Sequence, residues 1–253
     1  MVTQDDLGAD VPLAGPARRI VSLVPSLTEA IAATARGRLV GATDWCTHPA
    51  DLEEMGVTRV RGTKNPDRPA IEALRPDLVV ANQEENRELD VRRLREAGIP
   101  VWVTRIESVP EAITSMRRLL TEALQVAEPA WLTEAAARWG GAVPARRATV
   151  AVAVWRDPWM VVGRDTFTGD LLARAGLANI YAEHPARYPT LDVGAIDTAG
   201  ADVVLLPDEP YPFTSVDGPE SFAETRTRLV SGRLLTWYGP ALVAAHDALH
   251  EIC

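Results

Sequence analysis

The sequence predicts an α/β protein with two lobes, each built on a parallel sheet with covering helices. Three observations carry this prediction. Short apolar runs rich in Val and Ile alternate with helical patterns over residues 17–107, the segment 108–146 reads as helix without a strand, and the alternation resumes over residues 147–253. Strands that alternate with helices form parallel sheets, because each strand needs a crossover before the next one can begin.

The first block, residues 17–107, shows the clearest helix and strand signals. Ser26 and Glu29 stand three residues apart, the capping-box pattern, and predict a helix through Thr34. Gly98 closes a later helix, since glycine readily adopts the left-handed backbone that ends helices. The patterns predict strands at 19–24, 39–43, 77–82 and 101–104, and helices at 69–74 and 89–97.

The helical connection, residues 108–146, is expected to contain two helices. Leu119, Leu120, Ala123 and Leu124 share one apolar face, and Pro129 begins a second helix that ends at glycines 140 and 141. Beyond it, the second block predicts strands at 149–155, 159–162, 201–206 and 234–237, a helix at 169–175 and a C-terminal helix.

Composition narrows the classes of function. The 253 residues are 47% hydrophobic and 24% charged, as in ordinary globular proteins. The net charge of −9, from 26 basic and 35 acidic residues, argues against a nucleic-acid partner, which requires clustered Lys and Arg. The longest apolar run, 148–155, is far shorter than the roughly 20 residues that cross a bilayer.

The first residues and the cysteines predict a cytoplasmic protein. The start, MVTQDDLGADVPLAGPARR, is acidic and lacks the apolar region of a secretory signal. Cys46 and Cys253 cannot form a disulfide framework, and free thiols fit a reducing compartment. An extracytoplasmic location would follow if a leader had been removed.

Loops at the ends of the predicted strands hold the candidate site, because open α/β sheets bind ligands there. The segments VPSLTE, DWCTHP and TKNPD are such loops. Rigid aromatic surface with a few polar groups suits flat macrocycles and siderophore complexes; packing in the core or at the rim is the alternative for each ring. The aromatic candidates are Trp45, Trp155, Trp159, Tyr188, Tyr211, Phe213, Trp237 and Tyr238.

Polar residues on the same kinds of loop complete the candidate set. Arg156 and Arg164 stand out, since an arginine beside tryptophans can clamp a carboxylate or phosphate. GRDTFTGD lacks both the G-x-G-x-x-G and the Walker patterns, which disfavours a nucleotide. The other polar candidates, of which about half are expected to be solvated only, are Lys64, Asn65, Glu84, Glu85, Asn86, Asp165 and Glu209.

Cys46 and His48 form a C-x-H pair on one loop. Thiolate and imidazole bind zinc, iron or the cobalt of a corrinoid, so both are candidate metal ligands. Bracing of the loop is a slightly favoured alternative, and a cysteine nucleophile with His48 as base lacks an evident third group. His246, His250 and Cys253 share one face of the last helix at metal-competent spacing, but chain ends are usually unordered, so we assign them no function from sequence.

The order of these motifs resembles the class III periplasmic binding proteins, the helical-backbone receptors for cobalamin, haem and iron-siderophore complexes. The resemblance runs from VPSLTE, DWCTHP and TKNPD through ANQEENRELDVRRLREAGIPVWVT, VGRDTFTGDLLARAGLANIYAEHPARYP and ADVVLLP, nearly the whole chain after residue 17. It implies two Rossmann-like lobes joined by a backbone helix, for which the segment after Pro129 is the candidate. It also implies a ligand held in the inter-lobe cleft, with no catalytic step and no required cofactor.

The resemblance extends to single positions. Trp45 and Tyr188 fall where cobalamin receptors place aromatic contacts, whereas Thr63 falls where they offer tryptophan. Thr58 and Ala178 stand where such receptors present glutamates to an ABC permease, so that ion pair is missing here. We expect a monomeric receptor for cobalamin, haem or a ferric chelate, with an ABC permease as a candidate partner. The alternatives are a cytosolic metal- or corrinoid-handling protein or enzyme using Cys46 and His48, and a structural interaction module.

Overall fold

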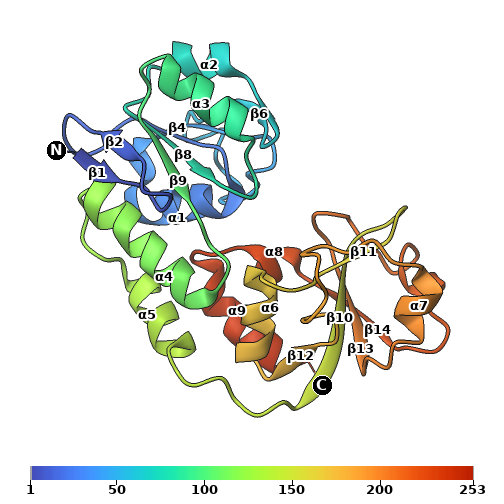
Figure 1. Cartoon of the computed structure of the whole chain (residues 1–253). Helices are drawn as coiled ribbons and strands as arrows, with labels where there is room; N and C mark the ends of the chain where they lie inside the picture. Colours follow the sequence, from blue (N-terminus) through green and yellow to red (C-terminus); the bar gives the residue numbers. More distant parts are fainter. Residues whose placement is uncertain (1, 253) are drawn as a thin grey trace. The chain divides into compact units, whose positions relative to one another are not determined.

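The computed structural model describes residues 2–252, and Val2 only by its backbone. It confirms the α/β class, with two parallel sheets and covering helices (Figure 1). The chain divides into two compact units, which are described separately below. The first unit comprises Met1–Ile106, Glu111–Ala135 and Tyr238–Pro240, and the second comprises Glu107–Pro110, Ala136–Trp237 and Ala241–Cys253.

The first unit is built on a five-stranded parallel sheet with the order β5-β4-β3-β8-β9. The chain runs outward from the central strand β3 to β5 and then crosses to β8 on its other side. The carboxyl ends of β3 and β8 therefore form a topological switch point, where open α/β sheets bind ligands. The strands are β3 Ile20–Ser22, β4 Leu39–Ala42, β5 Thr58–Arg59, β8 Leu78–Asn82 and β9 Val101–Thr104.

Helices cover both faces of this sheet (Figure 1). Ile71 of α2 and Leu94 of α3 pack with Val21, Leu23 and Val79 in one core. Helix α1 lies on the opposite face, and most of its residues from Ser26 to Ala32 are buried. The helices are α1 Pro25–Ala35, α2 Arg68–Ala73 and α3 Glu88–Glu96, with a short 3-10 turn at Arg36–Arg38 and a hairpin of β6 Arg61–Gly62 and β7 Asn65–Pro66.

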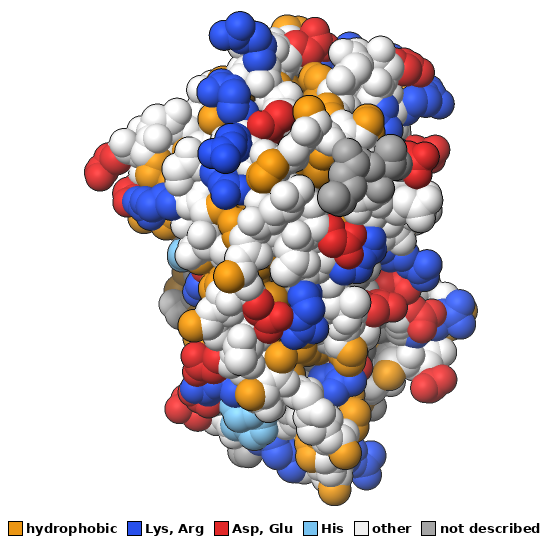
Figure 2. All heavy atoms as spheres, turned by 90° about the vertical axis from the view of Figure 1, so that its left-hand side faces the viewer, with side chains coloured by type: hydrophobic (Ala, Val, Ile, Leu, Met, Phe, Trp, Pro, Cys, Tyr) orange, Lys and Arg blue, Asp and Glu red, His pale blue; other side chains and the backbone are white. Residues whose placement is uncertain are grey.

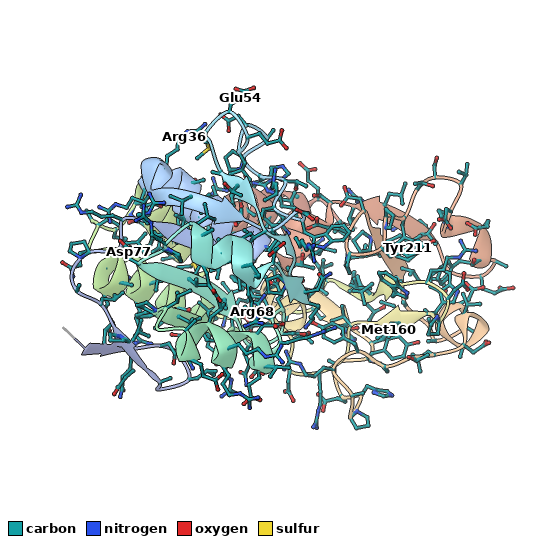
Figure 3. All side chains as sticks on the ribbon, turned by 90° about the horizontal axis from the view of Figure 1, so that it is seen from above. Arg36, Glu54, Arg68, Asp77, Met160 and Tyr211 are labelled. Carbon is teal, nitrogen blue, oxygen red and sulfur yellow. The ribbon has the colours of Figure 1, made fainter. Side chains whose placement is uncertain are left out.

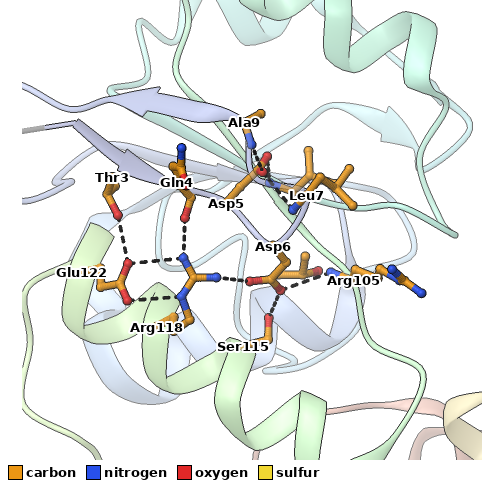
Figure 4. Close-up of polar contacts among 12 residues, drawn as sticks. Thr3, Gln4, Asp5, Asp6, Leu7, Ala9, Arg105, Ser115, Arg118 and Glu122 are labelled. Carbon is orange, nitrogen blue, oxygen red and sulfur yellow. Dashed lines mark hydrogen bonds and ion pairs between the residues drawn. The ribbon is translucent and has the colours of Figure 1, made fainter.

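A hairpin that the sequence patterns did not predict, β1 Val2–Gln4 and β2 Asp10–Pro12, covers the free edge of β9. The amide of Asp6 donates to the carbonyl of Val103 at 3.1 Å, and the amide of Val103 donates to Asp5 Oδ2 at 3.3 Å. The guanidinium of Arg118 forms an ion pair with the carboxylate of Asp6, with NH1 2.8 Å from Oδ1 (Figure 4). These contacts satisfy backbone groups that an edge strand otherwise leaves open to another chain.

The second unit has β12 and β13 on either side of β10, all parallel, with β14 beside β13 and β11 antiparallel to the end of β10. Helices α6, α8 and α9 lie on one side of this sheet and α7 on the other (Figure 1). Its strands are β10 Ala148–Trp155, β11 Met160–Val161, β12 Leu177–Asn179, β13 Val203–Pro207 and β14 Thr227–Val230. Its helices are α6 Phe167–Arg174, α7 Val193–Asp197, the 3-10 turn Pro219–Ser221, α8 Gly232–Thr236 and α9 Ala241–His250.

The predicted helical connection contains α4 Val109–Arg118, which continues as a π-helical turn over Leu119–Ala123, and α5 Ala130–Trp139. The division between the two units falls inside α4 and inside α5, so both helices carry the chain from one unit to the other.

Two local predictions are wrong. Val24, not Ser26, is the N-cap of α1, because Pro25, with its fixed φ, occupies the first helical position and places Ser26 inside the helix. Residues 234–236 are not a strand but part of α8, since a short apolar pair such as Leu234 and Leu235 does not distinguish a strand from a one-turn helix.

None of the helices within residues 2–252 is long and apolar enough to cross a membrane. On the face drawn in Figure 2, acidic and basic side chains are interspersed, apart from a short row of basic side chains at the upper left.

Candidate functional site

Asn82, the last residue of β8, shapes the loop at the switch point of the first sheet. Its Oδ1 accepts the amides of Glu84 at 2.8 Å and Glu85 at 3.2 Å, and its Nδ2 donates to Thr104 Oγ1 at 3.1 Å. The side chain is buried, so these bonds are protected from water. The loop after β8 is thereby fixed to the end of β9.

Asn86 joins this loop to two others. Its Oδ1 accepts the amide of Asn82 at 2.8 Å, while its Nδ2 donates to the carbonyls of Leu23 at 3.2 Å and Thr63 at 3.0 Å. Leu23 follows β3 and Thr63 lies at the tip of the β6–β7 hairpin. Three loops at one edge of the sheet are therefore held in a single arrangement before any ligand arrives, as is usual for binding sites.

Trp45 is the most exposed aromatic candidate, with 66% of its surface accessible. Its loop is tied to the hairpin by the bond from the amide of Asp44 to the carbonyl of Arg61, 2.9 Å. A Cβ at Gly62 would lie 3.3 Å from Trp45 Nε1 and 2.4 Å from Asn65 Oδ1, so a larger residue there would displace the Asn65 side chain. A large apolar ring held in water by a fixed loop is typical of a binding surface.

Charged residues lie on the hairpin tip and on the loop after β8. Lys64 Nζ donates to the carbonyl of Glu84 at 2.5 Å, and Glu85 Oε1 accepts from the hydroxyl of Tyr238 at 3.0 Å. Burial, and next the carboxylate of Glu85, raise the pKa of Tyr238 well above its usual range, so the phenol stays a neutral donor. We call Trp45, Thr63, Lys64, Glu84 and Glu85 the first-unit loop surface.

Cys46 and His48 do not converge. Cys46 is fully buried, with Sγ 3.0 Å from Thr28 Oγ1 and 3.1 Å from Thr43 Oγ1, whereas His48 is exposed and its Nδ1 lies 3.1 Å from Thr47 Oγ1. Burial raises the pKa of the Cys46 thiol, which keeps it protonated. Within residues 2–252 no three His, Cys, Asp or Glu side chains are grouped to hold a metal. This geometry supports bracing of the loop by Cys46 over metal ligation by the pair.

The second unit places another aromatic group at the end of β10. Trp155, 43% exposed, stands edge-on to Tyr211 with ring centroids 5.6 Å apart, and Tyr211 lies 4.6 Å from Phe213 (Figure 3 labels Tyr211). Phe213 and Trp159 are stacked at 5.6 Å and buried, so these two rings are core residues.

Arg156 beside this group already has carboxylate partners. Its guanidinium pairs with Asp217 and with Glu220, the latter at 2.5 Å, and lies 5.6 Å from the centroid of the Trp159 ring. An arginine with two internal carboxylates has little capacity left for an anionic ligand, which reduces the value of Arg156 as a clamp.

The remaining candidates are spread over the second unit. Arg164 is exposed and pairs with Asp165 at 3.2 Å, and Tyr188 is half-buried. Glu209 is half-buried, and burial raises its pKa although the Trp237 side chain donates to it. Trp237 is itself buried. The structure thus brings together Lys64, Glu84, Glu85 and Tyr238, then Trp155, Arg156 and Tyr211, and then Glu209 and Trp237.

Comparison with known proteins identifies the family. The model of the periplasmic binding protein family matches residues 20–226. The chain belongs to the periplasmic binding protein family. The vitamin B12-binding protein of Vibrio campbellii is 24% identical over 203 residues, covering 76% of this chain and 71% of the relative. That of Salmonella typhimurium is 27% identical over 179 residues, covering 68% and 66%.

Solved structures of other periplasmic binding proteins share the fold. The periplasmic heme-binding protein RhuT from Roseiflexus sp. RS-1 superposes with a TM-score of 0.76 at 23% identity, over 94% of this chain and 99% of that one. Helicobacter pylori CeuE, solved with nickel, gives 0.79 at 15% identity, over 99% and 87%. At such identities the likeness supports the fold alone.

The family corrects one prediction. We expected a cytoplasmic protein, and this is wrong, because the matched family and the relatives with solved structures are periplasmic binding proteins. The prediction used the free cysteines and the composition of the first residues, which lie outside the range 20–226 that the family model matches. The family also consists of proteins that bind and carry substrates rather than convert them.

Proposed function

We propose that this protein is the substrate-binding receptor of an ABC transporter and captures a metal-containing macrocycle or chelate on its first-unit loop surface. The observation that carries the proposal is the exposed ring of Trp45 on a loop bonded to the β6–β7 hairpin, which Asn86 holds at Thr63. A rigid aromatic surface can stack on a flat macrocycle at low cost in conformational entropy.

Charge favours a corrinoid within this class. The first-unit loop surface has two acidic residues, Glu84 and Glu85, and one basic residue, Lys64, so its charge suits a ligand that carries N–H donors rather than anionic groups. The amide side chains of cobalamin supply such donors, whereas the carboxylates of haem and the anionic groups of many ferric chelates would meet like charge. The relatives named as vitamin B12-binding proteins agree with this choice.

The proposal needs no catalytic step and no resident cofactor. The bound metal complex would be cargo, released unchanged. The alternative of an enzyme that uses Cys46 and His48 is not favoured, because burial raises the pKa of the thiol and the imidazole lies apart from it on the surface.

The permease remains the proposed partner, with docking contacts of another kind. Thr58 is exposed on β5 and Ala178 is half-buried on β12, and neither side chain carries charge. Ion pairs at these two positions are therefore not part of the proposal. We expect the receptor itself to be a monomer, which size-exclusion chromatography would check.

Thermal unfolding of the purified protein with cyanocobalamin, haemin, a ferric siderophore and free zinc tests the proposal. A ligand at 100 times its Kd stabilises the folded state by about 2.7 kcal/mol, a shift of several degrees. We expect the largest shift with cobalamin, and recovery of the ligand unchanged. Absence of a shift with all three complexes, or conversion of the ligand, would contradict the proposal.

A further inference from the structure

A histidine pair on the last helix plays no part in the proposed ligand binding. His246 and His250 stand four residues apart on α9, with ring centroids 4.3 Å apart and ring planes at 32°. We propose that these two side chains bind one divalent transition-metal ion through their Nε2 atoms. Imidazole nitrogen suits the later ions of the first row, so the site should take nickel, copper or zinc.

Hydrogen bonds set the tautomer of both rings. His250 Nδ1 lies 2.6 Å from the carbonyl oxygen of His246, and a carbonyl can only accept, so Nδ1 carries the proton. His246 Nδ1 lies 3.0 Å from Asp247 Oδ1, and a carboxylate likewise accepts. In each neutral ring the lone pair is then on Nε2, the atom that would bind the metal.

Neighbouring side chains orient the His246 ring in the way that hydrogen-bond partners behind the ligands of known metal sites orient those ligands. Asp247 accepts from His246 and is held in turn by Arg138 NH1, at 2.8 and 2.9 Å from its two oxygens. Trp139 stands edge-on to His246 at 5.1 Å, and its own Nε1 donates to the carbonyl of Leu242 at 2.8 Å. A carboxylate on the second nitrogen of a ligating histidine orients the ring and raises its basicity.

The pair lies away from the strand ends that carry the second unit's aromatic group. Arg147, just before the start of β10, donates to the carbonyls of Leu249 and Ile252 at the end of α9. His250 is therefore near the amino edge of this sheet, whereas Trp155 ends β10 at the opposite edge. Metal binding here would not involve the second unit's aromatic group.

The site would be open. Two imidazoles fill two of the four or six positions that these ions prefer, and within residues 2–252 no third His, Cys, Asp or Glu is placed to bind the same ion. Water, or a donor from another molecule, would occupy the remaining positions. This predicts exchangeable binding rather than a structural metal.

Calorimetric titration of the Cys253→Ser protein with nickel chloride and zinc chloride tests the proposal, since the substitution removes a thiol that could itself bind these ions. We expect one ion per chain, and at least tenfold weaker binding in His246→Ala and in His250→Ala. His184→Ala is the matched control, because His184 lies in the same unit and its Nδ1 accepts the amide of Ala186 at 3.0 Å. The His184→Ala variant should bind nickel and zinc as tightly as the parent protein does.

Asp247→Asn separates a built site from two histidines that happen to be close. Loss of an outer carboxylate typically weakens metal binding 10- to 100-fold, so this variant should bind measurably less tightly while its thermal unfolding stays near that of the parent. Binding that is unchanged in both histidine variants, or lost equally in His184→Ala, would overturn the proposal. Circular dichroism of each variant confirms that α9 is intact.

Discussion

The hydroxyl of Tyr238 donates a hydrogen bond to Oε1 of Glu85, 3.0 Å away, and so connects residues 153 positions apart within the first unit. Tyr238 is buried, and burial together with the nearby carboxylate raises its pKa, which keeps the phenol protonated. The short segment Tyr238–Pro240 thereby holds the loop after β8, which carries part of the first-unit loop surface.

Removal of that hydroxyl should destabilise the protein. Hydrogen bonds to charged groups contribute about 1.5–3 kcal/mol, so we expect Tyr238→Phe to lower the free energy of unfolding by about that amount. In a double-mutant cycle with Glu85→Ala, urea unfolding should give a coupling energy above about 0.5 kcal/mol. Glu84→Ala serves as the control and should couple less. Additive effects of Tyr238→Phe and Glu85→Ala would show that the bond has no energetic role.

The Cys46 thiol should be unreactive in the folded protein. It is fully buried and its pKa is raised, so little thiolate is present near neutral pH. We expect iodoacetamide to label Cys46 only after unfolding, as followed by peptide mass spectrometry that distinguishes it from Cys253. Rapid native labelling of Cys46 would contradict the buried position.

His48 and Cys46 should differ in their effect on stability. His48 is exposed, and its replacement by Ala should change the free energy of unfolding by less than about 0.5 kcal/mol. Cys46→Ala removes the contacts of Sγ with Thr28 and Thr43 and should cost about 1–3 kcal/mol. Equal costs measured by urea unfolding, or selective loss of metal binding in Cys46→Ser, would revive a joint role for the pair.

Asp197 should make the second unit sensitive to acid. Burial opposes its charge, but donation from the amides of Ala223 at 2.8 Å, Glu224 at 3.0 Å and Thr225 at 2.7 Å outweighs this and lowers the pKa of Asp197. Since the folded pKa lies below the unfolded value of about 3.9, the stabilisation is present above about pH 4. It is lost as the pH falls through the folded pKa.

The Asp197→Asn variant checks this sign. It should be less stable than the parent at pH 6, and the difference should shrink as the pH is lowered below about 4. Urea unfolding at several pH values measures both curves. Two parallel curves would mean that the Asp197 carboxylate does not contribute through its charge.

The N-terminal hairpin should depend strongly on Asp5. Its carboxylate accepts hydrogen bonds from the amides of Leu7 at 3.0 Å and Ala9 at 2.9 Å and forms an ion pair with Arg95 at 2.7 Å. The Asp5 side chain is fully buried. Removal of one partner from a buried ion pair costs about 3–5 kcal/mol, which we expect for Asp5→Ala. Asp10→Ala, an exposed position in the same hairpin, should change stability by less than about 0.5 kcal/mol. Similar losses in the two variants would contradict this assignment.

Strong local patterns made much of the fold predictable. The buried runs at β8 and β9 and the amphipathic helix α3 agree with the predicted ranges to within a residue or two, because apolar periodicity is a local property. Short elements were missed or misassigned. Strands β12 and β14 and the β1–β2 hairpin lack a continuous apolar run, and α8 has the same apolar pair that a strand would show.

The candidate site was predictable in its location but not in its construction. Parallel strands place their carboxyl ends together, which made the loop containing Trp45 a sound prediction. The roles of Asn82 and Asn86 depend on partners up to 63 residues away in the sequence. Likewise, the ion-pair partners of Arg156, Asp217 and Glu220, lie 61 and 64 residues further along the chain. A polar Asn at the end of a buried strand is the one signal that could have indicated Asn82 in advance.

Titration of the wild-type protein and of Trp45→Ala with cyanocobalamin, followed by tryptophan fluorescence and calorimetry, tests the central claim most directly. Because loss of an aromatic anchor typically costs 1–3 kcal/mol or more, we predict stoichiometric binding with quenching in the wild type and an affinity about 5- to 150-fold lower in Trp45→Ala. Leu89→Ala, another exposed apolar residue of the first unit, should bind like the wild type. Equal affinity in wild type and Trp45→Ala would contradict the claim that the first-unit loop surface binds the ligand.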